Sequence, residues 1–324
     1  MALPNESARA LPLKAKRCEG GQAPPSKARH CNAISVDGMD HVAVAALNGL
    51  VVGASIALVA AGLALLFGVL GILNFAQGDF FMAGAYIVWA AVSHGISFWL
   101  ALVAAVIVVG LAGGLALMGA LWPLRDRPQA LILLATIAFS LILEVLASNT
   151  FGSDSKPVAP PFAGHIPVGH TEYPAYDLLV VVAAAVILTG GFVFLKYMKY
   201  GIWLRAVAQN QRMASTLGLP VGRVYAVAFI VSAGLAAVAG SLLVPLTAVY
   251  PTVGLDINLS AFIVVIAGGL GNFRGAALIA LVLGVAESLG SIYIPGAGVD
   301  VAVFALVILI VIVRALRPRV AVRL

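Results

Sequence analysis

Charged residues are scarce in this chain of 324 residues: Asp, Glu, Lys and Arg together make up 10%, whereas 62% of the residues are hydrophobic. Soluble domains carry about 25% charge, and the mean hydropathy of this chain is +1.08, so a water-soluble fold is excluded. Cysteine is scarcer still. The two cysteines, Cys18 and Cys31, lie in the polar N-terminal stretch, and they predict neither a disulfide framework nor a metal site.

The first 40 residues differ from the rest of the chain. They are rich in Pro, Lys, Arg and Ser and contain no apolar run that could serve as the core of a signal peptide. We therefore predict a disordered polar extension at 1–40, followed by a membrane domain at 41–324. Met39 stands directly before the first apolar run, so it is a second candidate for the natural start, and whether residues 1–38 are expressed stays open.

The hydrophobic residues come in runs of roughly 20, the length of a helix that crosses a bilayer. They do not show the short alternating segments of a membrane barrel. No residue from Val42 to Gly78 is charged, which predicts one helix to about Leu66, a bend, and a second segment that is either a crossing or a re-entrant piece. The fold class is therefore all-α and polytopic, with about eight or nine membrane segments. Further segments are expected at 98–121, 130–148, 177–195, 224–249, 257–270, 276–294 and 299–313.

Basic residues gather in a few loops, so the net charge of +6 is interpreted as a topology signal and not as a nucleic-acid site. The loop 196–223 holds lysines and arginines without an acid, and the loop 123–128 and the C-terminal tail are also basic. The positive-inside rule assigns all three to the cytoplasm. The proline-rich loop 149–176 is assigned to the outside. We predict a multi-pass protein of the bacterial inner membrane whose C-terminus is cytoplasmic.

No arrangement of residues typical of an enzyme is found. The sequence contains no HExxH, CxxC or Gly-x-Ser-x-Gly motif, and its histidines lie at or outside the ends of the apolar runs. The Gly-rich stretch 268–275 lacks the Gly-Lys-Ser/Thr ending of a phosphate loop, so it is interpreted as a tight break between two helices. We predict no catalytic residue, no metal and no cofactor in this chain.

A polar cluster opens the second apolar segment. The stretch Gly71–Tyr86 carries Asn74, Gln77, Gly78 and Asp79 at the edge of an apolar helix. Polar groups at membrane depth are costly and usually face protein or a water-filled path, and glycine lets helices approach closely. Two interpretations stay open from the residues alone. Asn74 or Asp79 caps a helix at the membrane interface, or the cluster shapes a translocation path.

The loop 201–219 has a helical pattern that a simple connection does not need. A helix stop follows at Gly218 and Pro220. Such a helix lies on the membrane surface with its arginines on lipid headgroups, or it inserts into a groove of a partner protein. The pattern is an apolar stripe with spacings near three and four, made of Leu204, Val207, Met213, Ala214 and Leu217.

Three segments, taken in order, resemble one family. Gly71–Tyr86 is similar to the G-I-[IL]-N-F-A-[HQ]-G signature of branched-chain amino acid ABC transporter permeases of the LivH type. Gly201–Leu219 with Arg223, and Gly268–Glu287, are similar to two later segments of that family. The resemblance implies the membrane-spanning permease subunit of an ATP-driven ABC importer, which translocates branched-chain or other hydrophobic amino acids across the inner membrane.

The resemblance also implies partners and site residues. A second homologous permease subunit (in a homo- or heterodimer), two cytoplasmic ATPases that bind ATP, and a periplasmic or extracellular solute-binding protein would complete the importer, within membrane lipids. The segment 201–219 would be the coupling helix. Ala206, Ala214, Leu217 and Gly218 match its motif and are expected to form the packing core of the contact with the ATPase. Arg205 is expected to contact the ATPase rim. Asn74, Gln77 and Gly78 match the first signature and, with Asp79, are expected along the path.

Three departures and two rivals accompany this interpretation. Asn210 stands where the family commonly has an acid, the tail lacks the usual Gly-rich continuation, and the extension 1–40 has no counterpart. A urea or short-chain amide permease of the same class cannot be separated by sequence. An ion-driven secondary carrier would need carboxylates or broken helices near the bilayer midplane; Asp79, Glu144 and Glu287 are scattered in sequence, although folding could gather them.

Overall fold

The computed structural model describes residues 25–124, 127–162, 164–168, 171–293 and 305. The chain divides into two units, Met1–Met39 and Asp40–Leu324, and the contacts below all belong to the second. Helix α1 begins at Pro25, so residues 25–40, for which the sequence predicts disorder, are helical in the structure. Proline is favoured in the first turn of a helix, and no further proline interrupts α1. The predicted last span and the basic tail fall outside the described residues, apart from residue 305.

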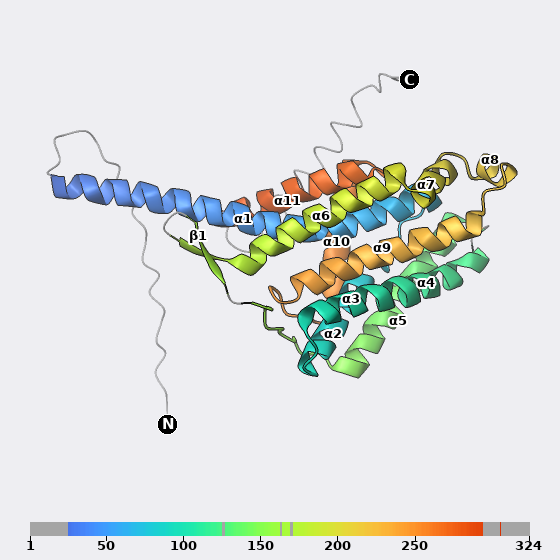
Figure 1. The fold of residues 1–324 in the computed structure, drawn as a ribbon, viewed down its shortest axis with the longest axis horizontal. Helices are drawn as coiled ribbons and strands as arrows, with labels where there is room; N and C mark the ends of the chain where they lie inside the picture. Colours follow the sequence, from blue (N-terminus) through green and yellow to red (C-terminus); the bar gives the residue numbers. More distant parts are fainter. Residues whose placement is uncertain (1–24, 125–126, 163, 169–170, 294–304, 306–324) are drawn as a thin grey trace, which may run out of the picture. The chain divides into compact units, whose positions relative to one another are not determined.

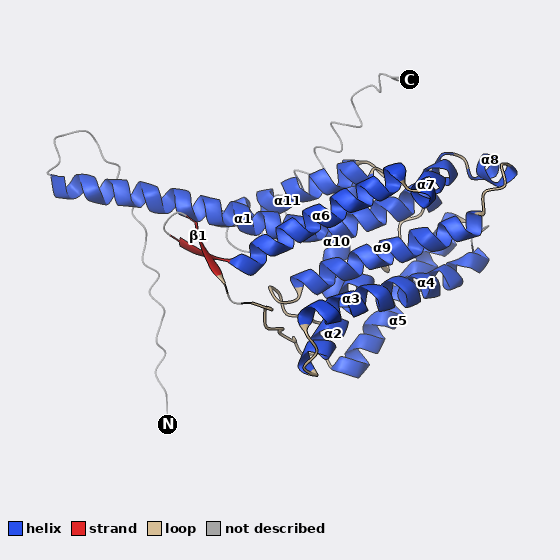
Figure 2. Ribbon diagram, viewed as in Figure 1, coloured by secondary structure: helices blue, strands red, loops and turns tan. Residues whose placement is uncertain are grey.

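Helices make up most of the described chain (Figures 1 and 2). The one β-sheet among the described residues is a short two-stranded hairpin. The strands are β1 (His165–Val168) and β2 (Thr171–Pro174), which pair antiparallel. The helices are α1 (Pro25–Leu70), α2 (Gln77–Ser93), α3 (Phe98–Val108), the π-helical turn η1 (Val109–Gly113), α4 (Gly114–Leu121), the 3-10 turn η2 (Trp122–Leu124), α5 (Gln129–Phe151), α6 (Ala175–Tyr197), α7 (Lys199–Gln209), α8 (Gln211–Thr216), α9 (Val221–Leu243), α10 (Val253–Gly268) and α11 (Phe273–Tyr293).

Six helices of the described chain are long and apolar enough to cross a membrane. They differ in how much of their surface other helices cover. The apolar windows of α1 and α9 are 83% and 78% buried, whereas those of α5, α6 and α11 are 22%, 11% and 22% buried. The unit therefore has α1 and α9 in its interior, and its outer helices turn apolar side chains away from the protein. The six spans are Val42–Leu70, Phe98–Leu124, Gln129–Phe151, Ala175–Tyr197, Val221–Leu243 and Phe273–Ile292.

Two further apolar helices, α2 and α10, have 17 and 16 residues. At 1.5 Å per residue each is about 25 Å long, shorter than the ~30 Å core of a bilayer. Both begin inside the protein. Gln77, the first residue of α2, bonds to Ser232 at the middle of α9, and Gly254 near the start of α10 packs on Gly78. The chain from 71 to 76 thus turns back from the end of α1 into the interior before α2 starts.

The two ends of the bundle differ in chemistry. One end carries α7, α8 and the start of α9 (Figure 1) and is basic. The opposite end carries the hairpin and the 152–162 segment, where Lys156 and Val249 exchange backbone hydrogen bonds of 2.8 and 3.0 Å. The Tyr173 hydroxyl donates to Asn48 Oδ1 on α1 at 2.9 Å. Burial, followed by the nearby Asp177 charge, raises the pKa of Tyr173, so its hydroxyl stays protonated and keeps this bond.

Candidate functional site

A network of buried polar groups, called here the polar junction, joins α1, α2, α9 and α10. Its members are Asn74, Gln77, Gly78, Ser232 and Asn258. The Gln77 amide nitrogen donates to the Ser232 carbonyl at 3.0 Å, and the Ser232 hydroxyl lies 2.9 Å from both Gln77 Oε1 and the Gly62 carbonyl. Gln77 is fully buried. Because each polar atom in this pair has a protein partner, the arrangement stabilises the meeting of three helices inside an apolar core.

The first turn of α2 is capped by a residue of another helix. Asn258 of α10 accepts a 3.0 Å hydrogen bond from the Gly78 backbone N–H and donates to the Phe75 carbonyl. The backbones of Gly78 and Gly254 touch, and a Cβ on Gly254 would lie 2.9 Å from the Gly78 carbonyl carbon and oxygen. Only glycine allows this approach. Asn74 Oδ1 accepts from the Ala76 N–H at 3.1 Å, in the turn that precedes α2. The sequence offered Asn74 or Asp79 as the cap, whereas the Gly78 N–H in the first turn bonds to Asn258.

Two atoms of this region lack a hydrogen-bond partner among the described residues: Asn74 Nδ2 and Asp79 Oδ2. Both residues are 2% exposed. Ser140 and Glu144, both on α5, lie close enough to Asp79 to interact electrostatically with its carboxylate. Folding thus brings together two carboxylates that are 65 residues apart in sequence. Glu287 lies on α11 beside Ser288, which bonds to the Ala45 carbonyl of α1.

Sequence reasoning missed Ser232, Asn258 and Ser140, which complete this region from three other helices. A signal for Asn258 was present, because an amide inside a short apolar segment is costly unless it is paired. Serines give no such signal, since their hydroxyls often bond within their own helix. Among the described residues no group of three or more His, Cys, Asp or Glu gathers as a metal site would require.

The loop 201–219 forms two helices where the sequence predicts one. Helix α7 ends at Gln209, and the backbone of Asn210 is extended. The Asn210 side chain then accepts a 3.0 Å hydrogen bond from the Met213 N–H, so Asn210 is the N-cap of α8. An acidic side chain at this position would accept the same hydrogen bond. Asn210 can therefore replace the acid that the family commonly has here, without a salt bridge.

The apolar stripe of this loop divides between two faces. Leu204, Val207 and Ala214 are 1%, 2% and 3% exposed, so they attach α7 and α8 to the rest of the chain. Met213 and Leu217 are 59% and 75% exposed. Ala214, expected in a contact with a partner, is therefore covered by this chain itself, and Ala206 is only half-buried. The exposed apolar side chains here are Met213 in α8 and Leu217, the residue that directly follows the helix; together they are called the exposed face of α8.

Arg205 and Gly218 also have structural roles within this chain. The Arg205 guanidinium donates to the Lys196 carbonyl at the end of α6, at 3.0 Å. Gly218 has a φ of +76°, a conformation that costs other residues energy because of their Cβ. It follows the last turn of α8, where the Leu219 N–H bonds to the Ala214 carbonyl at 3.1 Å. Gly218 thus ends the helix that presents the exposed face.

Residues 45–316 match the family described as "Branched-chain amino acid transport system / permease component". The chain belongs to this family of membrane permeases. It is 34% identical over 281 residues to the high-affinity branched-chain amino acid transport permease LivH of Escherichia coli K12, covering 82% of this chain and 91% of that protein. It is 30% identical over 283 residues to the permease BraD of Pseudomonas aeruginosa, covering 83% and 92%.

A third relative is archaeal: the probable branched-chain amino acid transport permease of Methanocaldococcus jannaschii is 32% identical over 272 residues, covering 80% of this chain and 84% of that protein. No solved structure matches the chain. Membership of the permease family, together with the six long apolar helices found among the described residues, makes this chain a multi-pass transport subunit of the inner membrane and not an enzyme. The permease family works with ATPase and binding-protein components.

Proposed function

We propose that this permease is the membrane subunit of an ATP-driven importer that moves branched-chain or other hydrophobic amino acids across the inner membrane. The observation that carries the proposal is the family match over residues 45–316, which contains both the polar junction and the exposed face of α8. The relatives are named as high-affinity branched-chain amino acid transport permeases, and this supports the same class of substrate here.

The proposed assembly contains a second, homologous permease, two ATPases that bind the ATP, and a solute-binding protein. The end that carries α7 and α8 would face the cytoplasm, because its loops are basic, and the C-terminus would lie on the same side. In the described chain six helices are long enough to span the membrane. In this proposal the shorter helices α2 and α10 would be two further membrane segments, and the predicted segment 299–313 would be a ninth.

We place the translocation path beside Asn74, Gln77, Gly78 and Asp79. Non-helical backbone at membrane depth is tolerated where it is buried in protein or lines a cavity, and residues 71–76 are such a segment. The unpaired Asn74 Nδ2 and Asp79 Oδ2 atoms support the placement, because a buried polar group without a partner is costly and would gain one in a second conformation or from a substrate. The two conformations need to differ by only a few kcal/mol for ATP binding to select between them.

The exposed face of α8 is the proposed contact with the ATPase. Met213 on the short helix α8 and Leu217 at its C-cap form an exposed apolar pair, which fits a helix that inserts into a groove of a partner. Arg205 lies one helix earlier on an exposed part of α7, toward the rim. Movement of the ATPases would reach the spans through Leu204 and Val207, the side chains that attach α7 to the bundle.

The test is to isolate the permease from its native membrane in mild detergent and identify the copurifying proteins by mass spectrometry. Two ATPases and a second permease are expected. Leu217→Glu should release the ATPases, because it places a charge in the contact, whereas Ser215→Glu places the same charge on an exposed neighbour and should retain them. Recovery of the chain alone, from a preparation that preserves other membrane complexes, would contradict the proposal and favour an ion-driven carrier that uses Asp79 and Glu144.

A further inference from the structure

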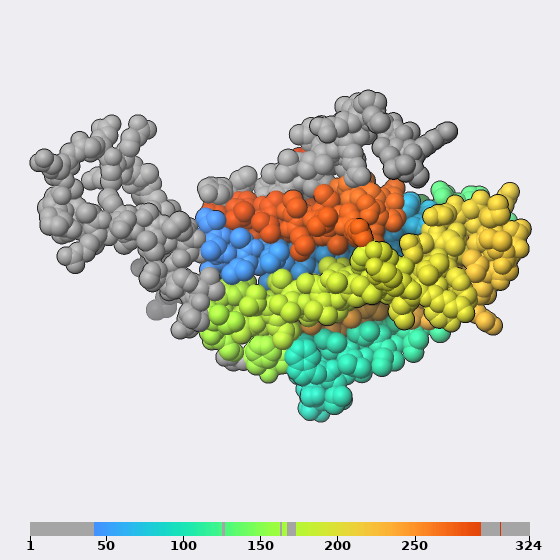
Figure 3. Space-filling view, turned by 45° about the horizontal axis from the view of Figure 1, so that its top comes forward, coloured from blue at the N-terminus to red at the C-terminus, as the bar shows by residue number. Residues whose placement is uncertain are grey.

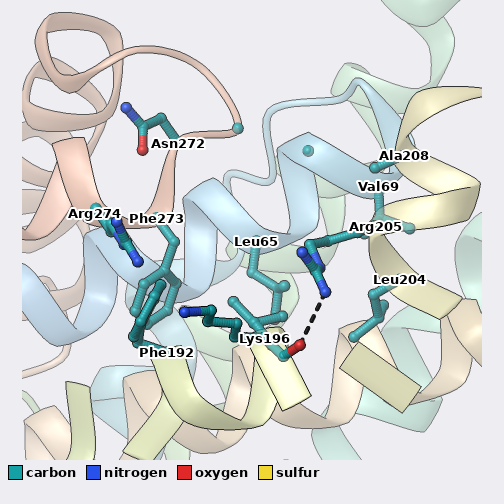
Figure 4. Close-up of a pocket in the computed structure, with 13 residues that line it drawn as sticks. Leu65, Val69, Phe192, Lys196, Leu204, Arg205, Ala208, Asn272, Phe273 and Arg274 are labelled. Carbon is teal, nitrogen blue, oxygen red and sulfur yellow. Dashed lines mark hydrogen bonds between the residues drawn. The ribbon is translucent and has the colours of Figure 1, made fainter. Parts of the chain in front are cut away.

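A cavity of about 370 Å³ lies at the basic end of the bundle, between α1, α6, α7 and the loop that precedes α11 (Figure 4). Three cationic side chains line it: Lys196 from the end of α6, Arg205 from α7 and Arg274 from the start of α11. No acidic residue is among its lining residues. Three like charges in one cavity repel one another, so the arrangement is stabilised when an anion enters.

The arginines of this cavity are held in place by contacts that leave donors available. The Arg274 guanidinium lies 3.7 Å from the centroid of the Phe192 ring, and Arg205 donates to the Lys196 carbonyl at 3.0 Å. A guanidinium has five N–H donors, so one such bond leaves the rest for a ligand. No Asp or Glu of the described chain stands among the residues that line the cavity with these three cations.

Apart from Asn272, the rest of the cavity wall is formed by apolar residues and glycines, which a site for a small soluble anion does not require. Leu65 and Val69 of α1, Phe192 and Leu195 of α6, and Phe273 contribute to it. Outside the cavity, α6 and α11 leave part of α1 uncovered between them (Figure 3). Both flanking helices carry exposed apolar side chains, among them Val186 and Val193 on α6 and Leu278 and Val282 on α11.

We propose that this cavity binds the phosphate headgroup of an anionic glycerophospholipid. Basic pockets between membrane helices on the cytoplasmic side bind headgroups of this kind. Lys196 and Arg274 would hold the phosphate, and the apolar surfaces of α6 and α11 would hold the acyl chains. This lipid site rests on the proposed function in one respect: the end of the bundle that carries α7 and α8 is taken to lie at the cytoplasmic leaflet. Because the cavity includes Leu204 and Arg205 of α7 together with α1, a bound lipid would stabilise the attachment of the coupling segment to the bundle.

Native mass spectrometry of the purified transporter tests this directly. The full-length complex is stripped of loosely bound lipid and titrated with phosphatidylglycerol, phosphatidylcholine of the same acyl chains, or the soluble headgroup fragment glycerol phosphate. One phosphatidylglycerol is expected to bind in preference to phosphatidylcholine, and glycerol phosphate is not expected to displace it. The lipid adduct is read on the mass of the permease chain, so the result does not depend on whether ATPases copurify or transport occurs.

The variant Lys196→Gln with Arg274→Gln should weaken phosphatidylglycerol binding about thirty-fold, since each cation near an anionic headgroup contributes roughly a fivefold factor. The matched control, Lys199→Gln with Arg223→Gln, removes the same two charges from exposed sites outside the cavity and should bind as wild type. Lys196→Arg with Arg274→Lys keeps both charges and should retain binding, which separates lost charge from misfolding.

Three results would overturn the proposal. Equal binding of phosphatidylcholine would show that the negative charge is not recognised. An equal loss in the matched control would assign the effect to net charge and not to the cavity. Displacement by glycerol phosphate at the concentration of the lipid would identify a site for soluble phosphates.

Discussion

Replacement of Gly78 by alanine tests whether the contact between α2 and α10 holds the polar junction together. A Cβ at Gly78 would fall on the carbonyl oxygen of Gly254, so the two helices would have to separate. That separation would also break the hydrogen bond from the Gly78 N–H to Asn258 Oδ1, which is 3.0 Å long. The substitution therefore combines overpacking with the loss of a buried hydrogen bond.

The magnitude follows from three contributions. Overpacking of a buried contact costs about 1–3 kcal/mol, the lost hydrogen bond costs about 0.5–1.5 kcal/mol, and the better helix propensity of alanine offsets about 1 kcal/mol. The free energy of unfolding should fall by about 2 kcal/mol, within a range of about 0.5–3.5. For a protein of this size each kcal/mol corresponds to about 2–4 °C, so the melting temperature in detergent should fall by about 4–8 °C.

Gly190→Ala is the matched control for this substitution. Gly190 lies within α6, and no atom lies within 4 Å of the position its Cβ would take, so only the propensity gain applies. Its melting temperature should equal or exceed that of wild type. A Gly78→Ala protein that melts at or above wild type would refute the close contact at the polar junction, whereas equal losses in both variants would indicate a general sensitivity of the helices to alanine.

Asn210→Ala should speed amide hydrogen exchange at Met213 about fivefold, because loss of an N-cap costs about 1 kcal/mol, while Asn210→Asp should leave the rate unchanged; equal exchange in all three proteins would contradict the capping role. Gly218→Val should lower amino acid uptake per ATP hydrolysed in proteoliposomes, since its φ of +76° costs a β-branched residue about 1–2 kcal/mol, and wild-type coupling would argue against the docking role of α8. A double-mutant cycle of Gln77→Leu and Ser232→Ala should give a coupling energy near 1 kcal/mol, and additive effects would show that their hydrogen bonds contribute nothing.

The sequence by itself determined the class of the protein and most of its segments. An apolar run that is long enough to cross a bilayer is almost always a helix, because backbone groups in lipid must form their hydrogen bonds within their own segment. The break at 268–275 and the stop at Gly218 were also readable, because glycine and proline have strong local preferences. The family signatures added the function, which composition and periodicity could not supply.

Only the tertiary structure decided what each polar residue contacts. The sequence could place Gln77 in an apolar segment, but its partner Ser232 is 155 residues away, and no local pattern encodes such a pairing. The same holds for the apolar stripe of 201–219, where Ala214 is covered by this chain and Leu217 is exposed. Helical periodicity predicts that these residues share a face. The packing of α7 and α8 on the bundle decides which of them stay exposed. The cavity of Lys196, Arg205 and Arg274 likewise exists only because three segments meet there in space.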